Sequence, residues 1–333
     1  MSGIFGLLTP ELTISAVEAA HGIVLDGTMQ PYPSYINRVY GLRDQDGREL
    51  VVKFYRPGRW SEEAIADEHR FVLDCAESEI PVVAPIENAA GQTISRVTLA
   101  GENGESGDFL FALFPKRGGR NFDAETDDDW FRLGSVIGRC HVVAQKSQAQ
   151  HRLECRPDGL TRGYLDELLA ANLVHPDSRE ELESVCRETL HAITPLFSDV
   201  RFQRVHGDCH RGNILDRPGT GLLIIDFDDM MMGPAVQDLW LLLPDHVEQC
   251  GRELSMLIDG YTQFADFDSR TINLVEPLRF MRIIYYLAWQ ARQRDDFRFR
   301  ASFPDWGTAA FWIKEIEDIR GQAAIVRDAI ESA

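Results

Sequence analysis

The sequence predicts an α+β fold in two lobes: an N-terminal lobe over residues 1–116, built of an antiparallel sheet with a helix, and a mainly helical C-terminal lobe over residues 117–333. Short β-type runs broken by turns fill the first third of the chain, whereas helical periodicity dominates after Asp127. Pro and paired Gly interrupt both patterns over residues 114–120, where we expect the hinge. A chain of 333 residues is long enough to form two cores.

Composition and charge limit the class of protein. Apolar residues make up 44% and charged residues 26% of the chain, which is typical of a globular protein. The net charge of −19 disfavours nucleic acid and anionic membranes as partners, because attraction to phosphate would have the wrong sign. The six cysteines include no C-x-x-C pair, which disfavours a zinc site and a disulfide framework. With no basic leader segment and no apolar run near the roughly 20 residues that span a bilayer, we expect a cytoplasmic protein. We also expect a monomer.

Caps, turns and apolar alternation predict the N-terminal elements. Thr9 and Pro10 fit an N-cap and a first-turn proline, which indicate a short helix. Ser61 is expected to cap a second helix that ends near Ser78. Strands are expected over residues 22–32, 37–43, 49–55, 92–99 and 108–114, with turns at 44–47 and 101–105.

Lys53 is a basic residue inside the apolar β-run VVKFYRP. It is either an edge-strand lysine that faces solvent or a residue that holds nucleotide phosphates, as a strand lysine does in kinases. In the second case a glutamate on the following helix has to hold the lysine. We choose Glu68, because apolar residues one turn later continue its inward face, whereas Glu62 and Glu63 lie near the exposed start of the helix.

The loop between the first two strands, PYPSYINR, contains no G-x-G-x-x-G sequence. Any cover over nucleotide phosphates must therefore come from Ser34, neighbouring backbone N–H groups and Asn37 or Arg38. The alternative is a plain hairpin loop. We take Ser34 as a candidate nucleotide contact.

The stretch 205–229, VHGDCHRGNILDRPGTGLLIIDFDD, contains most of the candidate chemistry. A polar loop is followed by two apolar β-runs joined by Arg-Pro-Gly-Thr-Gly, which predicts a hairpin. Because a hairpin brings its two ends together, we expect Asp208 and Asn213 to face Asp226. Two carboxylates and an amide oxygen form a Mg²⁺ site, since Mg²⁺ binds through one or two carboxylates plus substrate phosphates.

The spacing in this stretch is that of kinases. Asp208 and Asn213 stand in the order D-x-x-x-x-N, and Asp226-Phe227-Asp228 takes the place of D-F-G. A turn-rich hairpin in which Asp and Asn only cap the backbone is the alternative. Polar residues in kinase order between β-type runs favour a phosphoryl-transfer site, for which Asp208, Asn213 and Asp226 are the candidate catalytic and metal-binding residues.

The C-terminal region is expected to be helical. His141 is interpreted as a structural histidine. Asp238 either complements the dipole of a helix that begins near Gly233 or holds the backbone of the polar loop, and we favour the second. Aromatic residues such as Tyr285 either line a substrate cleft or belong to the core. Further helices are expected from Asp127 and over residues 160–173, 179–196, 247–264, 271–294 and 306–327.

HGDCHRGNIL and IDFDD resemble the motifs of the aminoglycoside phosphotransferase and choline kinase superfamily, which shares the protein-kinase fold. Further blocks resemble the bacterial stress response kinase A family: PSYINRVYGL, VVKFYRPGRW, ADEHRF, IPVVAPI, GGRNFD, GPAVQDLWLLL and VEPLRFMRIIYYLAW. The resemblance implies a cytoplasmic, ATP- and Mg²⁺-dependent serine/threonine protein kinase of the stress response, which we expect to phosphorylate itself. It implies that Asp208 is the proton acceptor, Asn213 and Asp226 are the magnesium ligands, and Ser34 lies at the ATP site.

One position departs from ordinary protein kinases, because Gly207 replaces the arginine of H-R-D. Control by activation-loop phosphorylation then loses its usual receiver. Two other functions stay open. In the first, the acceptor is a small amino alcohol or an aminoglycoside, which the acidic composition would suit. In the second, the chain is a nucleotide-binding pseudokinase that acts by binding a partner.

Overall fold

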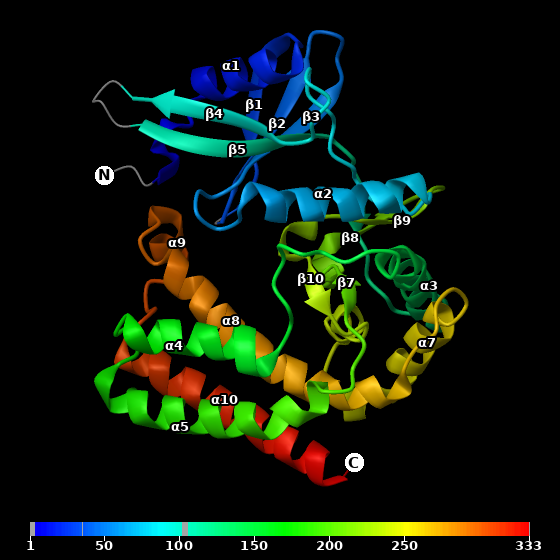
Figure 1. Cartoon of the computed structure of the whole chain (residues 1–333), viewed down its shortest axis with the longest axis vertical. Coiled ribbons are helices and arrows are strands. Elements are labelled where there is room, and N and C mark those ends of the chain that lie inside the picture. The colour runs from blue at the N-terminus through cyan, green and yellow to red at the C-terminus, as the bar shows by residue number, and fades with distance from the viewer. Residues whose placement is uncertain (1–3, 35, 102–105, 333) are drawn as a thin grey trace. The chain divides into compact units, whose positions relative to one another are not determined.

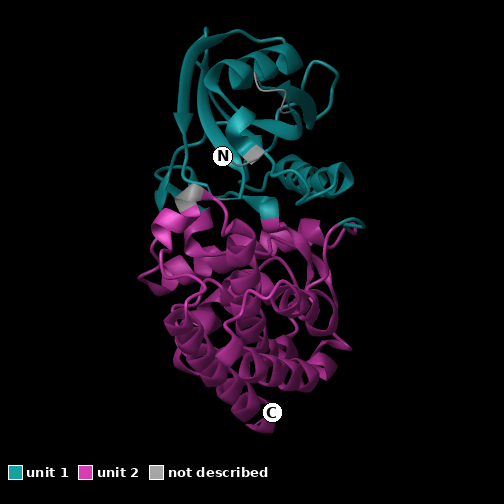
Figure 2. Ribbon diagram, turned by 90° about the vertical axis from the view of Figure 1, so that its left-hand side faces the viewer, with its two compact units in different colours: residues 1–121, 149–151, 214–228 teal, residues 122–148, 152–213, 229–333 magenta. Residues whose placement is uncertain are grey.

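The computed structural model describes residues 4–34, 36–101 and 106–332. The chain divides into two compact units (Figure 2). The first comprises residues 1–121, 149–151 and 214–228, and the second comprises residues 122–148, 152–213 and 229–333. The first contains most of the strands and the second most of the helices, so the predicted α+β fold is confirmed. The lobe division at residues 116 and 117 stays a prediction.

The first unit is built on a five-stranded antiparallel sheet with the strand order β1-β2-β3-β5-β4 (Figure 1). The predicted strands are present as β1 (Leu25–Pro31), β2 (Arg38–Asp44), β3 (Glu49–Phe54), β4 (Ser95–Ala100) and β5 (Ser106–Pro115). Residues 102–105 of the turn predicted between β4 and β5 lie outside the described residues. In this register Lys53 pairs with Val39 on one side and Ala112 on the other, so it lies on an inner strand and not on an edge.

Two helices accompany this sheet. The predicted caps begin both helices, because Thr9 accepts a hydrogen bond from the Leu12 N–H and Ser61 accepts one from the Ala64 N–H. Helix α1 (Pro10–His21) packs on β1 and β4, and α2 (Glu62–Glu77) contributes Ile65 to an apolar cluster with Tyr55 and Ala112. The α2 face that holds Glu68 is therefore buried beside β3.

The predicted hairpin also lies in the first unit and consists of β8 (Ile214–Arg217) and β9 (Gly221–Ile224). The short strand β6 (Arg120–Asn121) pairs with the other edge of β8, so the strand order is β6-β8-β9. The Ile224 N–H donates to the Pro81 carbonyl at 2.8 Å. Phe227 packs edge-on against Phe71 of α2, with 5.5 Å between ring centroids. These contacts fix the exit of β9, where Asp226 and Asp228 lie.

The second unit contains eight α-helices among the described residues: α3 (Asp127–Ala144), α4 (Arg162–Ala170), α5 (Pro176–Ile193), α6 (Gln237–Trp240), α7 (Gly251–Tyr261), α8 (Val275–Gln293), α9 (Phe297–Ser302) and α10 (Ala309–Ser332). Helices α4, α5, α8 and α10 pack together around one core (Figure 1). None of the described helices is long and apolar enough to cross a membrane.

One prediction for this unit was inaccurate, and one strand was missed. The helix expected from Gly233 is only the four residues of α6, because the apolar run after Trp240 is buried in turns and not in a continuing helix. The strand β10 (Met231–Gly233) was not predicted; it pairs antiparallel with β7 (Gln203–Val205). Strands of three residues are too short to show a periodicity of their own.

Helices α3 and α7 approach closely through glycine. A Cβ atom on Gly134 of α3 would lie 1.9 Å from the Leu257 carbonyl oxygen, and one on Gly260 of α7 would lie 2.0 Å from the Phe131 carbonyl oxygen. Both positions require glycine, because no backbone movement on this scale is available inside a packed pair. This contact brings His141 of α3 against Tyr261 of α7.

Candidate functional site

Lys53 lies among three carboxylates of the first unit. Its Nζ is 2.8 Å from Asp228 Oδ1, 3.4 Å from Asp226 Oδ1 and 3.8 Å from Glu68 Oε1. The Lys53 and Glu68 side chains are both buried, with 10% and 4% of their surfaces exposed. The predicted pairing of these two residues is present, and its role in holding nucleotide stays a prediction.

The charge of Lys53 is stabilised by this environment. Burial on its own would lower the pKa of the ammonium group, but the carboxylates of Asp228, Glu68 and Asp226 raise the pKa well above its ordinary value. Lys53 therefore remains a cation throughout the physiological range. It is a fixed positive charge that can bind an anion such as a phosphate.

Asp228 joins three segments of the first unit, which the sequence did not predict. Besides Lys53, it contacts the Arg59 guanidinium and accepts a hydrogen bond from Asn37 Nδ2 at 3.2 Å. Asp228 is 6% exposed. The only available signal was the second acid of IDFDD, which stands where D-F-G has glycine.

Asp226 differs from Asp228 in backbone and exposure. Its φ is +63°, in the left-handed region that few non-glycine residues adopt. Its side chain is 55% exposed, although it also contacts Lys53. Backbone strain of this kind clusters at functional sites, and the exposed carboxylate is suited to bind a cation.

Ser34, the predicted contact in the cover loop, is anchored through its backbone. Its carbonyl oxygen accepts a hydrogen bond from the Arg38 guanidinium at 3.2 Å. The neighbouring Tyr35 lies outside the described residues. The contact of Ser34 with nucleotide stays a prediction.

The polar loop of the second unit holds Asp208 and Asn213. Asn213 ends a short 3-10 turn, and its Nδ2 donates to the Asp208 carbonyl at 2.9 Å. This bond fixes the orientation of the amide, so that its Oδ1 is the atom that can serve as a metal ligand. Asp208 Oδ1 accepts from Arg282 of α8 at 2.6 Å, a contact that the sequence did not predict.

Asp238 holds the backbone of this loop, as we favoured from the sequence. Its two oxygens accept from the N–H groups of His206 at 2.7 Å and Gly207 at 2.9 Å. His141 Nε2 lies 2.9 Å from the same carboxylate, and His141 Nδ1 lies 3.0 Å from the Tyr261 hydroxyl. His141 is fully buried in this chain of contacts, which supports its interpretation as a structural histidine.

Gly207 has a structural reason to replace arginine. Its φ is +83°, and a Cβ atom there would lie 2.1 Å from the Asp229 carbonyl oxygen. Because the obstacle is backbone, no side chain fits at this position. The loop that presents Asp208 thus requires glycine immediately before it.

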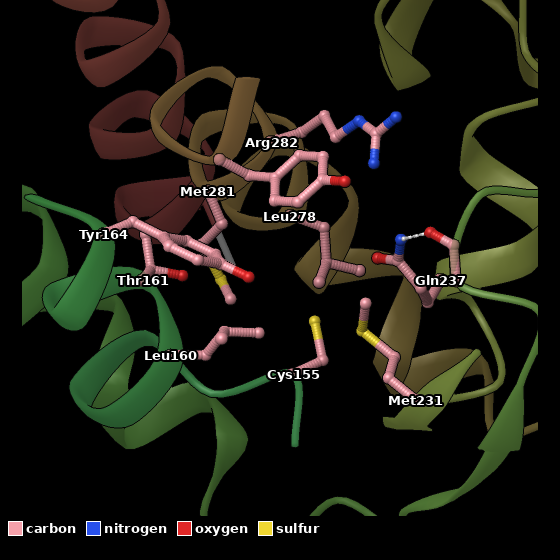
Figure 3. Close-up of a pocket in the computed structure, with 11 residues that line it drawn as sticks. Cys155, Leu160, Thr161, Tyr164, Met231, Gln237, Leu278, Met281 and Arg282 are labelled. Atoms are coloured by element: carbon pink, nitrogen blue, oxygen red, sulfur yellow. Dashed lines mark hydrogen bonds between the residues drawn. The ribbon is translucent and has the colours of Figure 1, made fainter. Parts of the chain in front are cut away.

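A cavity of about 40 Å³ lies beside Gly207 in the second unit (Figure 3). Figure 3 shows the Arg282 guanidinium at the edge of the group of side chains that line this cavity. The other lining residues are mostly apolar or aromatic: Cys155, Leu160, Thr161, Tyr164, Met231, Gln237, Leu278, Met281 and Tyr285.

The predicted magnesium ligands are divided between the units. Asp226 belongs to the first unit, and Asn213, like Asp208, belongs to the second, so their convergence on one ion stays a prediction. Among the described residues, no three His, Cys, Asp or Glu side chains are placed to hold a metal ion together. The predicted set nevertheless fits Mg²⁺, because it combines a half-exposed carboxylate with an oriented amide oxygen and leaves positions for phosphate oxygens.

Comparison with known proteins assigns the family. A model of the phosphotransferase enzyme family matches residues 28–272. The chain is 37% identical over 330 residues to stress response kinase A of Escherichia coli (strain K12), covering 97% of this chain and 95% of that protein. It is 36% identical, with the same coverage, to the serine/threonine protein kinase RdoA of Salmonella typhimurium (strain LT2).

Solved structures support the fold. Amicoumacin kinase hAmiN, in complex with AMP-PNP, Ca²⁺ and Ami, matches with a TM-score of 0.70 and 19% identity over 95% of both chains. A microcompartment-associated aminopropanol kinase matches with a TM-score of 0.67 and 17% identity over 96% of this chain and 98% of that one. From these matches, the chain is a kinase that belongs to the phosphotransferase enzyme family and, within it, to the stress response kinase A family.

Proposed function

We propose that this kinase transfers the γ-phosphoryl group of ATP to serine or threonine hydroxyls of proteins, its own chain included, in a stress response. The observation that carries the proposal is the cluster around Lys53, a buried and permanently charged lysine held by Glu68, Asp226 and Asp228. A kinase requires such a lysine to bind the phosphates of its nucleotide. The name of the relative RdoA supports a protein as the acceptor.

Each candidate residue then has a role. Lys53 binds phosphate oxygens, and Ser34 contributes to the cover over them. Asp208 orients the acceptor hydroxyl and receives its proton, while the bonds from Asp238 keep the loop in place. Asn213 and Asp226 hold Mg²⁺, which when bound neutralises the charge that develops on the phosphoryl oxygens.

The name of the relative RdoA, a serine/threonine protein kinase, supports a protein acceptor over an aminoglycoside. A small amino alcohol is the second candidate acceptor, because the net charge of −19 would attract a cationic substrate.

Mass spectrometry of the purified protein after incubation with Mg²⁺ and ATP tests the proposal. We expect phosphoserine or phosphothreonine on the chain or on a generic protein substrate, and little transfer to a panel of amino alcohols and aminoglycosides. Asp208→Ala should lower the rate at least 100-fold and Asp226→Ala should abolish metal-dependent turnover. Asp318→Ala, at a half-exposed position of α10, is the matched control and should retain full activity.

Two outcomes would contradict the proposal. A fully active Asp208→Ala protein would remove the assigned proton acceptor. Rapid transfer to an amino alcohol, with none to protein, would move the chain to the second candidate function.

A further inference from the structure

The segment between β3 and α2, residues 56–60, brings a second cation to the Lys53 cluster. We propose that Arg59 is a phosphate-binding residue of the nucleotide site, acting beside Lys53 on the triphosphate. This inference rests on the proposed function, because it requires that the chain binds ATP. It assigns a role to a residue that stands in the block VVKFYRPGRW but has no function in the kinase signatures.

The geometry starts from Asp228. One oxygen of its carboxylate, Oδ1, lies 2.8 Å from Lys53 Nζ, and the other, Oδ2, contacts Arg59 NH1. Two cations on the two oxygens of one carboxylate must lie side by side. An extended triphosphate that contacts Lys53 is therefore within reach of Arg59.

Burial and charge favour a recognition role. The side chains of Lys53 and Arg59 are only 10% and 14% exposed. The carboxylates of Glu68, Asp226 and Asp228 surround them, and Asp226 is the one assigned to Mg²⁺. A planar guanidinium offers five N–H donors in a fixed fork, enough to contact a carboxylate and a phosphate together. Such forks bind phosphate oxygens in bidentate fashion, and lysine cannot.

Arg59 is also tied to the cover loop. Asn37 donates to Asp228, and its Oδ1 accepts from the Arg56 N–H at 3.1 Å. The Arg56 side chain donates in turn to the Ile36 carbonyl at 2.9 Å. The segment that holds Arg59 is thus bonded to the loop that ordinary kinases fill with glycine. Because this loop has no G-x-G-x-x-G backbone to supply phosphate donors, a guanidinium beside it supplies them instead.

Calorimetric titration of the full chain with Mg²⁺–ATP and, separately, with adenosine tests this role. In Arg59→Gln we expect the Kd of ATP to rise at least tenfold and the Kd of adenosine to change less than twofold, because adenosine has no phosphate. Arg59→Lys keeps a positive charge beside Asp228 but loses the guanidinium fork, so we expect its Kd for ATP to lie between those of wild type and Arg59→Gln. Arg48→Gln is the matched control, since Arg48 pairs with Asp44 in the same unit and is 65% exposed.

The outcomes separate the inference from the function on which it rests. Equal weakening of ATP and adenosine binding, or unchanged ATP affinity in both Arg59 variants, would overturn the phosphate role while leaving the proposed function intact. A wild-type chain that binds no ATP would overturn both. Thermal unfolding of each variant shows whether it is folded. If Arg59→Gln does not fold, the ATP and adenosine titrations of Arg59→Lys test the inference.

Discussion

Each unit holds a buried aspartate beside its candidate site residues, and the two carboxylates have different hydrogen-bond and charge partners. Asp238 of the second unit is 1% exposed and is satisfied by two backbone N–H groups and a histidine. Asp228 of the first unit is 6% exposed and is satisfied by Lys53, Arg59 and an amide. The first arrangement fixes a loop, and the second gathers positive charge.

This difference fits the roles proposed for the two sites. A residue that receives a proton must be held in one place, and hydrogen bonds to backbone are directional and short. A site for phosphate needs cations, and buried cations require a carboxylate partner. One aspartate therefore supports geometry and the other supports charge.

Removing the Asp238 carboxylate should lower the free energy of unfolding more than any other change proposed in this comparison. Asp238→Ala leaves the His206 and Gly207 N–H groups buried without their acceptor, and we expect the free energy of unfolding to fall by about 3–5 kcal/mol. Urea unfolding measures the change, and Asp259→Ala, on the exposed face of α7, is the control. A loss below about 1 kcal/mol would show that Asp238 does not hold the loop.

Neutralising Asp228 should lower the free energy of unfolding by a smaller amount. In Asp228→Asn, Lys53 keeps Glu68 and Asp226, so we expect a loss of about 1.5–3 kcal/mol. The loss should be nearly the same at low and high salt, because ions screen buried charges only weakly. Urea unfolding at low and high salt gives both quantities. A loss as large as that of Asp238→Ala would remove the contrast between the two sites.

The smallest expected effect is on the dependence of stability on pH. Burial on its own would raise the pKa of Asp238, but the hydrogen bond and charge of His141, with smaller effects from His206 and Gly207, bring the pKa below its ordinary value of 3.8. A lowered pKa in the folded state adds stability above pH 3.8 and loses it as the pH falls further. Each unit of lowering corresponds to about 1.4 kcal/mol.

The advantage of wild type over Asp238→Asn in free energy of unfolding should therefore narrow between pH 7 and pH 3. The raised pKa of Lys53 has the opposite sign, since its contribution is present at pH 10.5 and below and is lost only in stronger alkali. An advantage that is constant down to pH 3 would contradict the assignment to Asp238.

The sequence determined the local elements and the order of the chemical groups. Caps at Thr9 and Ser61 and the hairpin after Asn213 depend on neighbouring residues, so local patterns predicted them. Glu68 followed from the inward face of one helix. These predictions succeeded because the interactions involved span a few residues.

The tertiary structure alone decided which distant groups meet. Arg59 reaches Asp228 across 169 residues of chain, Arg282 reaches Asp208 across 74, and His141 reaches Asp238 across 97. No periodicity of the sequence encodes such pairs, because they depend on how sheets and helices pack and not on local backbone preference. For the same reason Gly207 reads in the sequence as a departure from H-R-D, and only the fold shows the Asp229 carbonyl that excludes every other residue there.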